Sequence, residues 1–265
     1  MSDEYRSARG GRRPDTGPVF PKVGEVFAQK YRVEGLLGTG GYARVYKARQ
    51  VDLDRRVAIK VLDPMMSKGG ESDPRADSVD VVPVRFEREA RVISDLRSPY
   101  TITVHEYGRT DDDLLYMILE YVDGVTLAEV DVPMASERVV DILGQTLESL
   151  QEAHDAGLLH RDLKPANIML YEHLGRADQI KVLDFGIAKQ LVEEEGDPGS
   201  RTTVQNLTGE NTLIGTPRYL APEQVRGEEV GPARDIYSIG LIAYELIVGR
   251  QAVQAEKSVD ILARH

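Results

Sequence analysis

Cysteine is absent from the 265 residues, so disulfides, zinc–thiolate sites and a thiol nucleophile are excluded. A chain without cysteine fits a reducing compartment, and we expect a cytoplasmic location. Long apolar runs are also missing: the longest in the C-terminal third is Ile236–Tyr244, far short of the roughly 18 residues of a membrane helix. The charged N-terminus holds no apolar segment for a signal peptide. We therefore expect no membrane segment in this chain, and a tether would have to lie in further C-terminal sequence.

Acidic residues outnumber basic ones: the chain has 44 aspartates and glutamates but only 33 lysines and arginines, which gives a net charge of −11. Such a chain repels nucleic acid and anionic membranes, so we expect no nucleic-acid partner. A local basic groove for a nucleotide is compatible with this balance. The apolar share of 41% is enough for one large domain or for two lobes that share a cleft.

Strands are predicted in the first half of the chain, where β-branched residues concentrate. They fall within 31–62 and then at 101–107 and 114–120, and a helix is expected over 85–96. Residues 1–22 are charged and poor in apolar side chains, a composition typical of a disordered leader.

Helices are predicted in the second half. Ser136 is a candidate cap for a helix that Gly157 ends, and its apolar residues recur at helical spacing. These apolar residues are Val139, Val140, Leu143, Leu147 and Leu150. Asp235–Val248 reads as another helix, apolar on most sides and so expected to be buried, with Gly249 as its stop. Strands first and helices later predict an α+β protein with two lobes.

A glycine-rich loop spans Leu37–Val45, and glycines let a backbone approach phosphate oxygens closely. A dinucleotide-binding fold would need a helix directly after this loop, but Val45–Ala48 reads as a strand. No Gly-Lys-Ser/Thr follows, which disfavours a P-loop ATPase. A hairpin over phosphates is the favoured interpretation, and a mere turn is the alternative.

Three motifs follow in a fixed order: His160-Arg161-Asp162 with Asn167 five residues later, then Asp184-Phe185-Gly186, then Ala221-Pro222-Glu223. Phosphate transfer to a hydroxyl needs a carboxylate beside that hydroxyl and oxygen ligands for magnesium. Asp162 can supply the first, and Asn167 and Asp184 can supply the second. Any one of these residues alone is compatible with a simple turn cap, so the ordered set carries the prediction.

Together with Val57-Ala58-Ile59-Lys60, these motifs resemble the catalytic set of protein kinases, and most closely that of bacterial serine/threonine kinases of the eukaryotic (Hanks) type. The resemblance runs from about Tyr31 to the last residue. It implies a small β-rich N-lobe with one helix and a larger, mainly helical C-lobe. The expected divisions are a leader at 1–30 and a kinase domain at 31–265, with the N-lobe at about 31–120, the hinge at about 120–123 and the C-lobe at about 124–265.

The family has a late arginine that pairs with the glutamate of Ala-Pro-Glu, and this chain lacks it. Glu223 is thus expected to be solvated, to pair otherwise, or to belong to a fragment with an incomplete C-lobe, which is the interpretation we favour.

The resemblance also implies roles for single residues. Asp162 would orient the hydroxyl and take its proton, Lys164 would stabilise charge on the γ-phosphate, and Lys60 would contact the α- and β-phosphates. Asn167 and Asp184 would ligate Mg²⁺, for which Mn²⁺ can substitute. The ATP site would comprise Leu37, Gly38, Thr39, Gly40, Gly41, Tyr42, Ala43, Val45, Ala58, Lys60, Glu120, Val122, Asn167 and Asp184, with Leu119 at the back of the adenine slot. Ala43 departs from the family, which has a third glycine there.

In the family a helix glutamate holds the lysine, and Glu87 and Glu89 are the candidates for Lys60. Phe86, Glu89 and Ile93 share one helix face, so Glu89 is preferred as the residue that faces inward. His160 is expected to be a packed structural residue and not a base.

Residues 187–214 contain several hydroxyls and are expected to form a switch segment. Autophosphorylation is predicted at Thr208 or Thr212, with Ser200, Thr202 and Thr203 as weaker candidates, and the phosphate would pair with Arg161.

The predicted activity is transfer of the γ-phosphate of Mg-ATP to serine or threonine hydroxyls of protein substrates, with self-association for autophosphorylation in trans. Lys164 two residues after Asp162, and the Gly215-Thr216 loop, are typical of serine/threonine kinases. One alternative is a pseudokinase that serves as a nucleotide-binding scaffold, and another is a small-molecule kinase that shares the fold.

Overall fold

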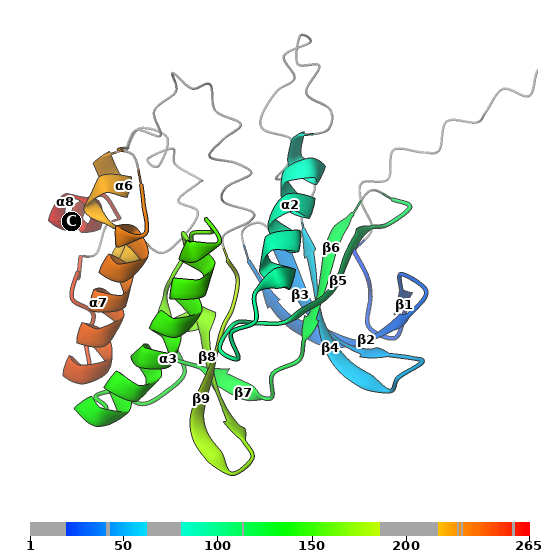
Figure 1. Cartoon of the computed structure of the whole chain (residues 1–265), viewed down its shortest axis with the longest axis horizontal. Coiled ribbons are helices and arrows are strands. Elements are labelled where there is room, and N and C mark those ends of the chain that lie inside the picture. The colour runs from blue at the N-terminus through cyan, green and yellow to red at the C-terminus, as the bar shows by residue number, and fades with distance from the viewer. Residues whose placement is uncertain are drawn as a thin grey trace, which may run out of the picture.

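Two sheets and a set of helices succeed one another along the long axis of the molecule (Figure 1). The computed structural model describes residues 20–40, 43–62, 81–112, 114–185, 217–226, 228, 230–255 and 258–265. Among these residues, the two-lobed α+β architecture expected from the sequence is confirmed: a sheet with one helix makes the first lobe, and helices dominate the second. None of the helices in this part of the chain combines the length and the hydropathy needed to span a membrane.

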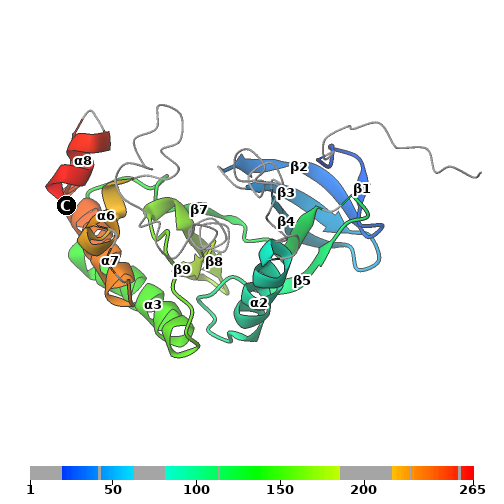
Figure 2. The same cartoon turned by 90° about the horizontal axis from the view of Figure 1, so that it is seen from above.

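The first lobe is built on a six-stranded antiparallel sheet with the order β1-β2-β3-β4-β6-β5. Its strands are β1 (Val26–Phe27), β2 (Tyr31–Thr39), β3 (Ala43–Gln50), β4 (Arg55–Leu62), β5 (Val104–Arg109) and β6 (Leu115–Glu120). The helix α2 (Val81–Asp95) lies against β5 and β6, as the view from above shows (Figure 2). β1 was not predicted, and it lies within the segment 1–30 expected to be a leader. The boundary at residue 31 stays a prediction.

The second lobe contains a small three-stranded sheet and the remaining helices. In chain order its elements are β7 (Gly124–Thr126), α3 (Ser136–Asp155), the 3₁₀ turn η1 (Pro165–Asn167), β8 (Ile168–His173), β9 (Arg176–Val182), η2 (Pro217–Tyr219), α6 (Pro222–Arg226), α7 (Ala233–Val248) and α8 (Ser258–Arg264). α3 and α7 lie side by side in both views (Figures 1 and 2).

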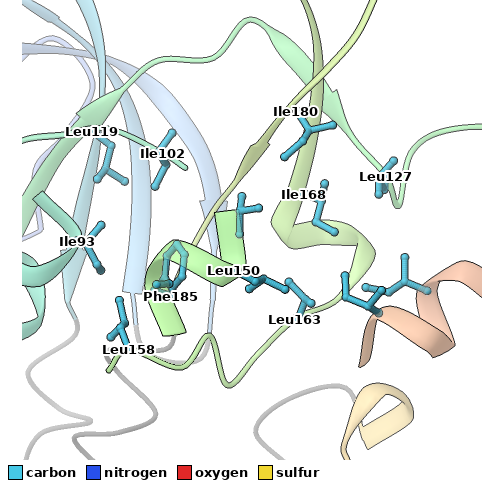
Figure 3. Close-up of a cluster of buried hydrophobic side chains, with 14 of the residues drawn as sticks. Ile93, Ile102, Leu119, Leu127, Leu150, Leu158, Leu163, Ile168, Ile180 and Phe185 are labelled. Atoms are coloured by element: carbon cyan, nitrogen blue, oxygen red, sulfur yellow. The ribbon is translucent and has the colours of Figure 1, made fainter. Parts of the chain in front are cut away.

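The large sheet has two buried faces, each with its own apolar cluster. Strand alternation puts Tyr46, Ile59 and Ile118 on the outer face, where their side chains pack together. Ala58 and Leu119, directly opposite each other in the register, lie on the inner face. The inner cluster runs on through Phe185 and Leu150 into the second lobe, so the two lobes share one apolar core (Figure 3).

The buried face of α3 differs from the prediction. Val140 is 68% exposed and Leu147 is also exposed, whereas Ile142, Thr146 and Ser149 are buried. The buried positions recur every three or four residues, as a single stripe requires, and two of them are hydroxyl residues that an apolar pattern does not reveal. The Ser149 hydroxyl lies 2.7 Å from that of Thr101, which satisfies both groups inside the core.

The ends of the two long helices are explained by local backbone geometry. Ser136 is the first helical residue, and no side chain caps this end, so its predicted capping role is wrong. Gly157 and Gly249 both adopt left-handed conformations just after α3 and α7, as predicted for stops. The burial predicted for α7 is wrong in part, because Ile236, Tyr244 and neighbouring apolar residues are exposed in the part of the chain that the structure describes.

Candidate active site

The inner face of the large sheet carries the residues assigned to the nucleotide. In the register Val45 lies opposite Lys60, and Ala58 lies opposite Leu119, so these four side chains point to the same side of the sheet. β2 and β3 converge on the glycine-rich loop, where the Gly40 N–H donates to the Ala43 carbonyl at 2.8 Å. Gly41 and Tyr42 lie outside the described residues.

Lys60 crosses from the sheet to the second lobe. Its Nζ donates to Oδ1 of Asp184 at 2.7 Å, and only 11% of the lysine side chain is exposed. Burial by itself would raise the pKa of Asp184, but the charge and the hydrogen bond of Lys60 outweigh it and hold this pKa below its ordinary value. The pair thus keeps Asp184 ionised at neutral pH. The side chain of Glu89, the predicted partner of Lys60, is outside the described part of the structure.

Asp235 of α7 anchors the loop that bears Asp162 through hydrogen bonds. This carboxylate is 1% exposed and accepts three hydrogen bonds: from His160 N at 2.9 Å, from Arg161 N at 3.1 Å and from His154 Nε2 at 2.8 Å. Burial tends to raise the pKa of Asp235, whereas these donors and the nearby imidazoles lower it, with a net lowering. These contacts tie the loop to the first turn of α7.

The backbone of the site is strained at two residues, one in this loop and one after β9. Arg161 has a φ of 64° and Asp184 a φ of 51°, both in the left-handed region that residues other than glycine rarely adopt. The Arg161 N–H bonds to Asp235, and its carbonyl accepts from Arg234 Nη2 at 2.7 Å. Contacts on both sides of the Arg161 backbone therefore hold the turn that presents the next residue, Asp162.

Asp162, Lys164 and Asn167 form a compact polar group. Lys164 Nζ donates to Oδ2 of Asp162 at 2.8 Å, and the Asn167 amide donates to the Asp162 carbonyl at 2.8 Å. Because the amide nitrogen of Asn167 is engaged in this way, its oxygen is the atom left to face a cation. The Leu183 N–H donates to the Asn167 carbonyl at 2.8 Å, which ties the strand leading to Asp184 to this loop.

His160 and Phe185 brace the site from inside. The His160 ring is fully buried, donates from Nε2 to the Leu183 carbonyl at 2.7 Å and lies 5.0 Å from the Phe185 ring. Burial lowers the pKa of His160, so the ring is neutral, and its Nδ1 can accept the Asp162 N–H at 3.3 Å. The structural role predicted for His160 is confirmed. Phe185 reaches toward Ile93 of α2 and Leu158 (Figure 3).

The predicted hinge follows β6. Glu120 is the last residue of that strand, and the ring of Tyr121 lies beneath the Lys47 ammonium at 4.9 Å. Val122 and Val45 both pack against the inner cluster, to which Ala58 and Leu119 belong.

The comparisons with known proteins agree with this geometry. The protein kinase domain family matches residues 31–264. The chain belongs to this family. A serine/threonine-protein kinase of Myxococcus xanthus, pkn3, is 39% identical over 257 residues, and PrkC of Bacillus subtilis is 35% identical over 246 residues. These alignments cover 96% and 92% of the chain.

Two further facts bear on the extent of the similarity. The chain spans less than half of its curated relatives, 43% of pkn3 and 34% of PrkC. The crystal structure of the PknI kinase domain of Mycobacterium tuberculosis superposes with a TM-score of 0.62 at 27% identity, over 91% of this chain and 85% of that one. The kinase fold is therefore shown both by sequence and by structure.

Three residues of this kinase domain were not predicted to matter, although each contacts the site. His154 bonds to Asp235 from within the core, and Arg234 bonds to the Arg161 carbonyl. Lys181 is buried in β9 and pairs with Glu120 at 2.7 Å. A charged residue between Ile180 and Val182, in a strand otherwise apolar at that end, was the signal that could have identified it.

Glu223 of Ala-Pro-Glu is half-buried at the start of α6. Gly186, the Gly215-Thr216 loop and the candidate phosphorylation sites at 187–214 all lie outside the described residues.

The oxygen donors of the site suit a magnesium ion. They are the carboxylates of Asp162 and Asp184 and the amide oxygen of Asn167, which are hard ligands of the kind that Mg²⁺ prefers. Asn167 and Asp184 are the residues that would hold it.

Proposed function

We propose that this chain binds Mg-ATP and transfers the γ-phosphate to serine or threonine hydroxyl groups of proteins. The observation that carries the proposal is the linkage of three separate segments at one place: β4, the loop 162–167 and residues 183–184. Lys60 bonds to Asp184, Lys164 and Asn167 bond to Asp162, and the Leu183 backbone joins the two groups. The names of the curated relatives, which are serine/threonine-protein kinases, support the same class of acceptor.

In the proposed mechanism Asp162 orients the acceptor hydroxyl and takes its proton as the oxygen attacks the γ-phosphorus. The new O–P bond forms while the bond to the β–γ bridging oxygen breaks, so ADP leaves with that electron pair. Lys164, held within 2.8 Å of Asp162, stabilises the charge on the phosphoryl oxygens. Lys60 is placed to exchange its bond to Asp184 for contacts to the α- and β-phosphates. A magnesium ion supplies charge neutralisation at the phosphates when it is bound.

Further parts of the proposal concern regulation and location. We propose trans-autophosphorylation within 187–214 through self-association, and a cytoplasmic site of action that suits a cysteine-free chain. Arg161 supports phosphorylation within 187–214, because its Nε is buried and has no hydrogen-bond partner among the described residues, so a phosphate could supply one.

The test of the function compares the wild-type chain with Asp162→Asn. Wild type should transfer radiolabelled γ-phosphate from ATP to a protein acceptor in a panel that also contains metabolites. Asp162→Asn should lose transfer by at least about 10²-fold while ATP binding persists. Binding without transfer by wild type would instead indicate a pseudokinase, and transfer to metabolites alone would indicate a small-molecule kinase.

A further inference from the structure

Lys181 is a charged side chain at the junction of the two lobes. It is 8% exposed, and its neighbours Ile180 and Val182 are fully buried on the opposite face of β9. Its Nζ lies 2.7 Å from Oε1 of Glu120 and 3.2 Å from the Thr101 carbonyl. The lysine of one lobe is therefore bonded to two segments of the other.

Glu120 is held from a second direction. The same Oε1 accepts the Thr103 N–H at 2.8 Å, and the Glu120 N–H donates to the Thr103 carbonyl at 2.9 Å. Glu120 ends β6 and begins the predicted hinge, so these contacts fix the place where the chain leaves the sheet.

The backbone around Lys181 is tied to the same joint. The Val182 N–H donates to the Tyr100 carbonyl at 2.7 Å, and its carbonyl accepts the Ile102 N–H at 3.0 Å. Residues 100–102 thus pair with the end of β9 in parallel. Ile102 and Ile180 mark the two sides of this joint in Figure 3. Asp184 follows Lys181 by three residues, on the same segment.

A charge at this position does something that an apolar side chain would not. A buried ammonium is tolerated only beside a partner, and a charge-assisted hydrogen bond has a preferred length and direction. The pair therefore selects one position of Glu120 relative to β9, whereas apolar packing would tolerate small shifts.

We propose that Lys181 is a positioning residue for the nucleotide base: through Glu120 it sets the hinge backbone that binds adenine at a fixed distance from the strand that delivers Asp184. The proposal rests on the proposed function, because it takes the hinge as the adenine site. Its consequence is that one ion pair aligns the base-binding and phosphate-binding parts of the site.

The 6-amino group of adenine gives a direct probe, since it is a hydrogen-bond donor that purine riboside triphosphate lacks. Binding of both nucleotides to the full 265-residue chain is measured by calorimetry. Wild type should prefer ATP by roughly 2- to 10-fold, the range for one hydrogen bond. In Lys181→Met the preference should fall toward one, and Lys181→Arg should keep part of it.

The control is Arg138→Met, which removes an exposed ion pair to Asp178 on the same strand, with Nη2 and Oδ1 2.7 Å apart. Arg138→Met should retain the wild-type preference. If Lys181→Met fails to fold, Glu120→Gln replaces it, because the amide oxygen can still accept the Thr103 N–H while the charge that holds Lys181 is gone. A reduced preference in Glu120→Gln supports the proposal, and an unchanged preference contradicts it.

Two results overturn the proposal: a wild-type chain that binds both nucleotides equally, or a Lys181→Met chain whose preference is unchanged, whether it binds both nucleotides as tightly as wild type or weakens both equally. Equal weakening would mean that Lys181 is only structural. Phosphate transfer by wild type is measured separately in the same preparations. If wild type fails to transfer phosphate but still prefers ATP, and Lys181→Met lowers that preference, the proposed function is contradicted and the positioning role of Lys181 is not.

Discussion

Replacement of Asp235 by asparagine should damage both stability and catalysis. The change keeps the shape of the side chain but removes its charge and turns one acceptor oxygen into a donor. Asp235 accepts from His154 and His160 on one oxygen and from Arg161 on the other. In either orientation the new amide group therefore faces an N–H donor inside the core.

The magnitude follows from these bonds. A hydrogen bond to a charged group contributes about 1.5–3 kcal/mol, and one is lost while the others weaken, so we expect a loss of roughly 2–4 kcal/mol in the free energy of unfolding. Release of the Arg161 backbone would also displace the adjacent Asp162. A displacement near 1 Å costs about 10²-fold in rate.

Urea denaturation and single-turnover phosphate transfer at saturating ATP measure the two effects. The matched control is Asp178→Asn, at a half-buried position near the surface that also pairs with an arginine and has a φ of 58°, which asparagine tolerates. It should change stability by about 0–1 kcal/mol. The anchoring argument is refuted if Asp235→Asn is no more harmful than this control, or if it unfolds more easily yet transfers phosphate at the wild-type rate.

Three further outcomes are expected. Burial lowers the pKa of His160, so the stability that its neutral ring contributes is fully present above the unfolded-state pKa of about 6.5 and is lost as the pH falls below it. His160→Gln should therefore flatten the decline in the free energy of unfolding between about pH 7.5 and 5.5, and an unchanged slope would contradict this. A Cβ on Gly124 would overlap the Leu170 carbonyl oxygen, so Gly124→Ala should lower the free energy of unfolding by about 1–3 kcal/mol. Gly144 has open space around it, so Gly144→Ala should raise the free energy of unfolding by about 0.5–1 kcal/mol, and urea denaturation measures both changes. After incubation with Mg-ATP, mass spectrometry should find phosphate within 187–214, and an active preparation without it would refute the proposed switch.

The sequence predicted the parts of the site that follow from local pattern. The Val57-Ala58-Ile59-Lys60 motif assigned Lys60 to the site, and the spacing of the catalytic motifs indicated the group around Asp162. Such features depend on a few neighbouring residues and on backbone geometry that each motif imposes.

Features that depend on distant packing could not be predicted. The Lys181–Glu120 pair forms only where β9 meets the end of β6, and nothing near either residue in the sequence specifies its partner. The face of α3 was misread because Ser149 is buried against the Thr101 hydroxyl, while the more apolar Val140 is 68% exposed.

The separate cluster on the outer face of the large sheet gives this protein a region that can be altered independently of its chemistry. Tyr46, Ile59 and Ile118 pack there, while the residues assigned to the nucleotide project from the same strands in the opposite direction. Substitutions that raise thermal stability can therefore be placed on the outer face of the sheet, through side chains that point away from the residues assigned to the nucleotide. One face of these strands thus contributes to stability, and the opposite face carries the residues assigned to the nucleotide.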